Sequence, residues 1–162
     1  MSQSLQNNNA EKKLVLLKKR ALYYLGKREY SRKELHEKIT PFSESLELTR
    51  QQVNQILTEL ESKDWLSDRR YADQFIFSKK RKFGLKKMEY ELKMRGVNEI
   101  IIHNALNEIK SEEYNLAKNI WEKKFRKLPE NPEERLKQMR FLQSRGINSA
   151  LIHQILSGKL SE

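Results

Sequence analysis

The feature that most limits how this chain can fold is an internal repeat with an offset of fifty residues. The segment LKMRGVNEIIIHNAL at 92–106 returns at 142–156 as LQSRGINSALIHQIL, with seven of fifteen positions identical. Each copy joins a helix end at an Arg-Gly pair to an Asn that can start the next helix. Because repeats of this length form units that pack through their neighbours, the sequence predicts a tandem array of helical modules.

The composition favours a string of small modules over one broad domain. Of the 162 residues, 37% are hydrophobic and 34% are charged, which is too little apolar material for a large core and too much for a disordered chain. We therefore expect an elongated array. No apolar run approaches the roughly 20 residues that cross a bilayer, the N-terminus lacks a secretory signal, and Cys is absent. We expect a cytoplasmic protein.

Helix signals divide the chain into three modules. No segment alternates between apolar and polar residues with a period of two, so we predict no sheet and an all-α fold of about nine helices, three to a module. The predicted boundaries are a disordered tail at 1–10, modules at 11–62, 63–110 and 111–158, and a tail at 159–162.

The first module shows its helix ends most clearly. The pattern predicts a first helix capped by Asn9 and ended by Gly26. A capping box at Ser31 opens a short second helix, which we expect Pro41 to stop, and Thr49 opens the third.

The other modules carry similar signals. Ser67, Asn98 and Asn131 are the residue types that cap helix starts, and Gly96 fits a left-handed helix end. In the third module we expect an apolar stripe that runs from Leu136 through position 139 to 142.

A formal net charge of +11 makes an anionic partner the leading expectation. The positive charge gathers in three clusters at 11–33, 79–95 and 123–145, one in each module. Such clusters can follow a phosphate backbone or an acidic surface, whereas the plainer interpretation is that they only keep helices soluble. The predicted contact surface consists of Lys18, Lys19, Arg20, Lys27, Arg28, Arg32, Lys33, Lys79, Lys80, Arg81, Lys82, Lys86, Lys87, Lys123, Lys124, Arg126 and Lys127.

Catalytic and metal-binding patterns are missing from the sequence. The five Gly are isolated, so there is no phosphate-binding loop, and three His without Cys do not form a zinc pattern. His103 and His153 occupy the same place in successive copies, which favours a structural role. We expect no catalytic residue, no metal and no cofactor, and therefore a binding protein and not an enzyme.

The aromatic residues divide into two groups. Helical spacing places Trp65, Tyr71, Phe75, Trp121 and Phe125 in or beside apolar stripes, so we expect them in the core. A second group lies among basic residues, where core packing and stacking on a partner are both open. This group consists of Tyr23, Tyr24, Tyr30, Phe83 and Tyr90.

Several motifs together resemble the bacterial RecX family. They are the segment LSDRRYA at 66–72 followed by Phe75, then Gly84, a Leu-x-x-Arg-Gly helix end at 92–96 and an Asn-led helix, with an earlier SRKEL element at 31–35. The resemblance covers nearly the whole chain after the first ten residues. Ser67 and Tyr71 depart from the residues that are usual in the family, and the start of the third module is the least similar part.

The resemblance implies a regulator of the RecA recombinase in DNA repair and recombination. Members of this family consist of tandem three-helix modules that bind the RecA filament on single-stranded DNA and limit its growth, ATP hydrolysis and strand exchange. Separately from the resemblance, we expect a monomer without membrane contact. Direct contact with single-stranded or duplex DNA through the basic faces is compatible with the resemblance.

Two other hypotheses are weighed against this one. In a helix-turn-helix DNA-binding regulator, a helix of the repeat at 92–106 would enter the major groove, but this segment is too apolar and too poor in Arg for that task. A structural adaptor built from helical repeats would bind neither RecA nor DNA. In all three cases we expect Asp68 and Arg70 to serve structure, because Asp68 lies near a helix N-terminus.

Overall fold

The computed structural model describes residues 1–159, and in that range it contains helices and no strand. The α-helices are α1 (Ser2–Leu25), α2 (Arg32–Ser45), α3 (Arg50–Ser62), α4 (Asp68–Lys79), α5 (Leu85–Met94), α6 (Glu99–Asn107), α7 (Glu113–Lys124), α8 (Pro132–Ser144) and α9 (Ser149–Leu156), with a 3-10 turn η1 (Lys110–Glu112) before α7. The prediction of an all-α fold of about nine helices is confirmed for the described part of the chain.

Chain contacts divide the protein into two compact units. The first contains Met1–Tyr71 and Arg95–Val97, and the second contains Ala72–Met94 and the chain from Asn98 onward. The three module boundaries expected from the sequence stay a prediction, and positions 160–162 of the expected tail lie outside the described residues. None of the helices in residues 1–159 has the length and apolar character that crossing a membrane requires.

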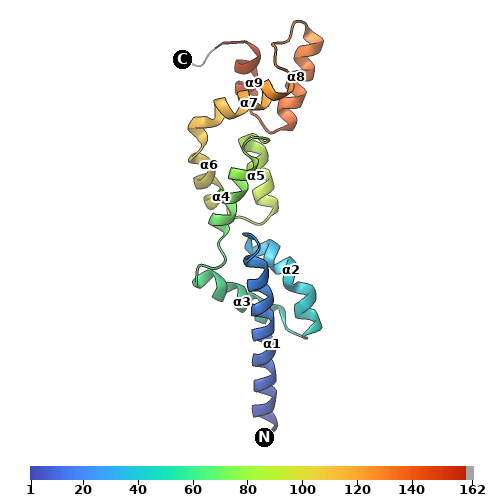
Figure 1. Cartoon of the computed structure of the whole chain (residues 1–162), viewed down its shortest axis with the longest axis vertical. Coiled ribbons are helices and arrows are strands. Elements are labelled where there is room, and N and C mark those ends of the chain that lie inside the picture. The colour runs from blue at the N-terminus through green and yellow to red at the C-terminus, as the bar shows by residue number, and fades with distance from the viewer. Residues whose placement is uncertain (160–162) are drawn as a thin grey trace. The chain divides into compact units, whose positions relative to one another are not determined.

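In the first unit, α1, α2 and α3 pack around one core (Figure 1). The residues at its centre are fully buried, namely Leu17, Ala21, Leu35, Ile39, Leu57 and Leu60. Helices α2 and α3 start where the sequence predicts. The Ser31 hydroxyl accepts from the Glu34 backbone N–H at 3.1 Å, and Thr49 and Gln52 form a reciprocal capping box.

Two expectations about the first unit are wrong. Residues 2–10, expected as a disordered tail with Asn9 as the cap, form the exposed first turns of α1. No Gly or Pro interrupts positions 1–25, so the helix extends from its packed part without a new nucleation step. Pro41 does not stop α2, because buried Ile39 and Ser43 on either side anchor the helix to the core.

The second unit holds α5 to α9 and most of α4. α5 packs on α6, and α7, α8 and α9 pack on one another (Figure 1). The α7–α9 core contains Trp121, whose indole N–H donates to the Gln138 side-chain oxygen at 2.7 Å. Gln138 is 5% exposed whereas Leu136 is 46% exposed. The expected apolar stripe is therefore wrong at Leu136. Gln138, which accepts the hydrogen bond of Trp121, faces the core, so a different side of α8 is buried.

Aromatic positions follow the predictions with one exception. Tyr71, Phe75 and Trp121 are buried, and Phe125 is partly buried and packs against the α7–α9 core. Trp65 is 46% exposed, against expectation, since it lies in the turn after α3 with the ammonium groups of Lys18 and Lys63 near its ring. In the undecided group Tyr30 is buried, Tyr24 and Phe83 are partly buried, and Tyr23 and Tyr90 are exposed.

The repeated Arg-Gly pair has one structural task in both copies. In the first unit the Ser31 hydroxyl, at the start of α2, donates to the Arg95 carbonyl at 2.7 Å. In the second unit the Gly84 N–H, at the start of α5, donates to the Arg145 carbonyl, also at 2.7 Å. Gly96 and Gly146 follow with φ of +78° and +80°. Each turn thus binds the N-terminus of an earlier helix.

The family-like residues at 68–71 serve this junction in the first unit. The Asp68 carboxylate accepts the Arg32 backbone N–H at 2.7 Å and so satisfies a donor at the start of α2. Burial raises the pKa of Asp68, and the bond from Arg32 opposes that shift. Arg70 pairs with Glu29 and Asp64, each at 2.9 Å. These contacts support the structural role expected for Asp68 and Arg70.

Tyr71 is expected to make stability fall at high pH. Burial, then the negative charge of Glu34, raises the pKa of its hydroxyl to about 12, although Arg95 and Arg28 oppose this. The unfolded chain loses that proton near its ordinary pKa of about 10. The stabilisation is therefore complete below pH 10 and is lost between about pH 10 and about pH 12, by about 2 kcal/mol. Urea unfolding from pH 9 to 12 measures it. The Tyr71→Phe variant should lack this component, and an identical pH profile in both proteins would contradict the assignment.

Candidate nucleic-acid interface

The second unit contains a groove of about 400 Å³ that is lined by positive charge. Its cations come from three places along the chain, and none of its lining residues is acidic. The lining consists of Arg81, Lys82, Ile120, Lys123, Lys124, Phe141 and Arg145. A groove of this kind attracts an anionic polymer and offers no carboxylate to repel it.

Local structure explains why these cations meet. Arg81 and Lys82 lie in the turn after α4, which is closed by a bond from the Lys82 N–H to the Lys79 carbonyl at 2.8 Å. Lys123 and Lys124 form the last turn of α7, where cations are favoured by the helix dipole. The Gly84 N–H bond to the Arg145 carbonyl holds the end of α8 against the turn after α4. Backbone contacts thus fix the groove.

The wall of the groove includes an aromatic ring. Phe141 is partly buried, and its ring packs edge-to-face on Phe125 with centroids 5.3 Å apart. The Arg145 guanidinium and the Lys124 ammonium lie 5.0 Å and 5.9 Å from the centre of the Phe141 ring. An aromatic ring among cations is the combination that binds single-stranded nucleic acid, because phosphates meet the cations and bases stack on rings.

The groove cations differ in how far they are already engaged. Within residues 1–159, no ion pair or ring contact involves Arg81, Lys82 or Lys123. These three side chains are exposed and keep their full charge for a partner.

Other predicted contact residues of the second unit do not line the groove. Lys80 pairs with Glu112 at 3.7 Å, and Lys127 pairs with Glu130 at 3.1 Å. Lys79 and Lys87 lie over the ring of Phe83. The two remaining members, Lys86 and Arg126, are exposed. Their role in binding stays a prediction.

In the first unit, the acidic stretch at 43–64 neutralises part of the predicted surface. Lys18 bonds to Glu59, and the Arg32 guanidinium lies 2.9 Å from Glu61. The bond between Lys18 and Glu59 raises the pKa of Lys18 and lowers that of Glu59. Ion pairs between side chains of the same unit leave less charge for a partner.

The other first-unit candidates contact rings, acids or a glycine turn, with one exception. Arg28 pairs with Glu34 at 3.2 Å and stacks on Tyr30, Arg20 stacks on Phe42, and Lys27 lies over Tyr23. The aliphatic part of Lys33 packs against the turn at Gly96. Lys19 is exposed and makes no ion pair or ring contact in the described part of the chain. All seven first-unit candidates remain predictions.

The sequence did not identify three residues of the groove lining as contact residues, namely Ile120, Phe141 and Arg145. Arg145 was identified only as part of the repeated helix end and of the basic stretch at 123–145, and Phe141 was not identified at all. Their spacing was a usable signal, because residues four apart share one side of a helix, and Phe141 and Arg145 flank the end of α8 in this way.

Two family models match the part of the chain after position 66. The model described as "RecX, second three-helix domain" matches residues 67–106, and that described as "RecX, third three-helix domain" matches residues 111–156. Both copies of the repeat therefore fall in successive three-helix domains, which confirms the prediction of tandem three-helix modules.

Sequence relatives and solved structures agree with these matches. The chain is 39% identical over 142 residues to "Regulatory protein RecX" of Chromobacterium violaceum, covering 88% of this chain and 90% of that protein. The protein of the same name from Ralstonia pickettii is 35% identical over 142 residues, covering 88% and 87%. A crystal structure of RecX from Lactobacillus salivarius matches with a TM-score of 0.74 at 19% identity, over 91% of this chain and 97% of that one. It shows likeness of fold.

Proposed function

The chain belongs to the RecX family of regulatory proteins, and from that premise we propose that it binds the RecA recombinase filament on single-stranded DNA. Binding inhibits the ATP hydrolysis, strand exchange and growth of the filament. The chain acts by occupying a surface and not as an enzyme.

The observation that carries this proposal is the basic groove of the second unit. A RecA filament on DNA presents both protein and phosphate, and a groove lined by cations without an acid is complementary to phosphate. Up to five cationic side chains can neutralise phosphates there, which releases the counterions that surround the DNA. We therefore propose that direct contact with the DNA strand strengthens binding to the filament.

The alternative of a helix-turn-helix DNA-binding regulator has less support. Neither α6 nor α9, the helices that follow the repeated turn, contains Lys or Arg. One side of each is used for packing, with Ile102 and Ile152 fully or almost fully buried. A recognition helix needs donors that reach base edges, and these two helices offer few.

The test is ATP hydrolysis by RecA assembled on single-stranded DNA, measured as substoichiometric amounts of the chain are added. We expect inhibition, and we expect the Arg81→Glu, Lys82→Glu variant to need roughly ten times more protein for the same effect. The broader reversal of Lys79, Lys80, Arg81 and Lys82 should weaken inhibition at least as much.

A matched control changes the same number of charges elsewhere in the second unit. Lys137 and Arg140 are exposed on α8 and do not line the groove, so Lys137→Glu, Arg140→Glu should inhibit like the original chain. Absence of inhibition by the original chain would refute the proposal. Sequence-specific duplex binding in its place would favour the helix-turn-helix regulator.

A further inference from the structure

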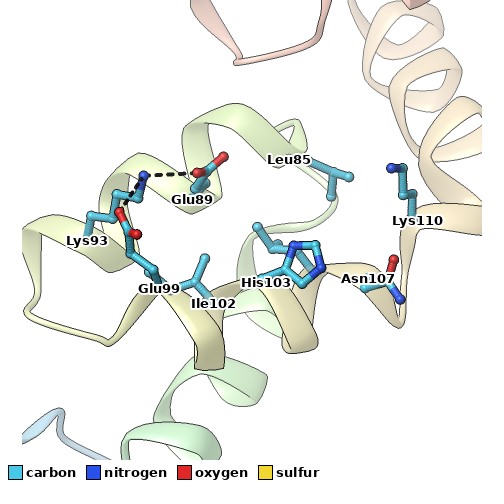
Figure 2. Close-up of a pocket in the computed structure, with 9 residues that line it drawn as sticks. Leu85, Glu89, Lys93, Glu99, Ile102, His103, Asn107 and Lys110 are labelled. Carbon is cyan, nitrogen blue, oxygen red and sulfur yellow. Dashed lines mark ion pairs between the residues drawn. The ribbon is translucent and has the colours of Figure 1, made fainter.

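A second groove lies between α5 and α6 and is unlike the basic groove. It has a volume of about 370 Å³, and Ile102 and Leu106 contribute its apolar side. Figure 2 shows Leu85, at the start of α5, on the opposite side from His103 of α6. The charged residues stand at its two ends.

The internal repeat supplies a reference for this groove. The offset of fifty residues pairs Leu85 with Arg135 and His103 with His153. The register holds in three dimensions, since Met88 and its counterpart Gln138 are both buried. The start of α8 and the side of α9 therefore correspond, residue by residue, to the groove between α5 and α6.

In the third module this place is filled by the chain's own arginine. The Arg135 guanidinium donates to the His153 ring nitrogen Nδ1 at 3.3 Å and to the Leu156 carbonyl at 3.5 Å. Leu156 is the last residue of α9, and the last carbonyls of a helix lack intrahelical partners and favour a nearby cation. The repeat thus shows which chemical group suits this position.

In the second module the same place lacks that group. Leu85 has no polar atom in its side chain and cannot donate to His103. Within residues 1–159 the exposed His103 ring makes no hydrogen bond. Its side chain instead lines the groove, as does Leu106, the counterpart of Leu156.

The second module adds negative charge that the third does not have. Lys93 lies 3.0 Å from Glu89 and 3.4 Å from Glu99, so two carboxylates share one ammonium group at one end of the groove (Figure 2). The counterparts of these two acids, Met139 and Ser149, carry no charge.

The opposite end of the groove carries one positive charge. Lys110 stands there beside Asn107 (Figure 2). The carboxylate end is therefore the end that is complementary to an incoming cation.

We propose that the groove between α5 and α6 binds an arginine side chain of a partner protein. The guanidinium takes the place that Arg135 fills in the third module, donating to His103 while Glu89 and Glu99 supply complementary charge. A planar guanidinium can donate hydrogen bonds to a ring nitrogen and an oxygen at the same time, whereas an ammonium group is a single point charge. The proposal goes beyond the proposed function, because it needs no DNA and uses a groove with an apolar side and a carboxylate end in place of the basic groove.

The test uses N-acetyl-arginine amide as the probe and the nuclear magnetic resonance signals of the His103 ring as the readout. We expect a saturable shift of His103 in the full chain, with an affinity roughly fivefold or more above that for N-acetyl-lysine amide. The Leu85→Arg variant should fill the groove from within, so its His103 signals should no longer respond to the probe.

Three variants keep the test decisive. Leu85→Met retains an apolar side chain and should leave the response unchanged. Arg135→Leu removes the internal arginine, so His153 should begin to respond, but more weakly than His103, because Met139 and Ser149 carry no charge. Glu99→Gln changes an exposed side chain, and it should weaken binding of the arginine probe.

Several outcomes would overturn the proposal. They are no shift of His103, equal responses to the arginine and lysine probes, a response to N-acetyl-aspartate in their place, or an undiminished response in Leu85→Arg. Circular dichroism of each variant separates loss of binding from loss of folding. RecA is absent from this experiment, so its failure would leave the proposed regulation of RecA standing, and the reverse also holds.

Discussion

Replacing Gly146 by Ala is expected to lower the free energy of unfolding by about 3 kcal/mol. Gly146 has a φ of +80°, a left-handed conformation that costs residues with a Cβ about 1–2 kcal/mol. An added Cβ would also lie 2.4 Å from the backbone nitrogen of Lys87, and relieving that overlap moves backbone atoms. Urea or thermal unfolding followed by circular dichroism measures the loss.

Two other glycines provide matched controls for this prediction. Gly158 has a φ of +68°, but its added Cβ would meet only the flexible end of Leu128, so Gly158→Ala should cost about 1 kcal/mol. Gly26 has a φ of −69° and its nearest atom is 3.4 Å away, so Gly26→Ala should be close to neutral. Equal losses for Gly146→Ala and Gly158→Ala would show that close approach to the start of α5 is not what requires glycine.

Neutralising the unengaged cations of the basic groove is expected to weaken binding of single-stranded DNA about a hundredfold near 0.1 M salt. The variant is Arg81→Gln, Lys82→Gln, Lys123→Gln. Each cation that meets a phosphate contributes about 0.7 to the slope of log affinity against log salt, so three should lower that slope by about 2. Fluorescence anisotropy of a labelled oligothymidylate, measured without RecA, gives the affinity and its dependence on salt. The salt concentration is varied from roughly 50 to 300 mM, where counterion release dominates.

A control for general electrostatics uses charges outside the groove. The variant Lys137→Gln, Arg140→Gln lowers the net charge of the same unit by two, but neither residue lines the groove. We expect its slope to stay near that of the original chain. If both variants lowered affinity in proportion to the charge removed, the groove would have no special part in binding.

The helix starts were predictable because they depend on neighbours in the sequence. Asn98 accepts from the N–H two residues ahead, and Asn131 and Asn148 accept from the N–H three residues ahead. Such bonds form within one helical turn wherever the chain lies. Trp65 and Leu136 were misplaced, and the burial of Gln138 was not predicted, because burial depends on which distant element covers a side chain.

The candidate site was predictable only in part, for the same reason. Charge clustering identified Arg81, Lys82, Lys123 and Lys124, but it did not show that these four meet in one groove. Phe141 was missed because nothing near it in the sequence marks an aromatic ring as part of a binding wall. In the first unit, clustering also selected Lys18 and Arg32, whose charges are engaged by Glu59 and Glu61.

The sequence by itself determined the helical content, the repeat, the positive charge and the family, because these reside in local patterns and residue identities. Only the tertiary structure decided which cations remain available to a partner, since the ion pair between Lys18 and Glu59 joins residues 41 positions apart. It also decided that one copy of the repeat fills its groove with Arg135 while the other leaves His103 exposed. Coulomb attraction and packing act through space, so residues that are distant in the chain determine the surface that a partner meets.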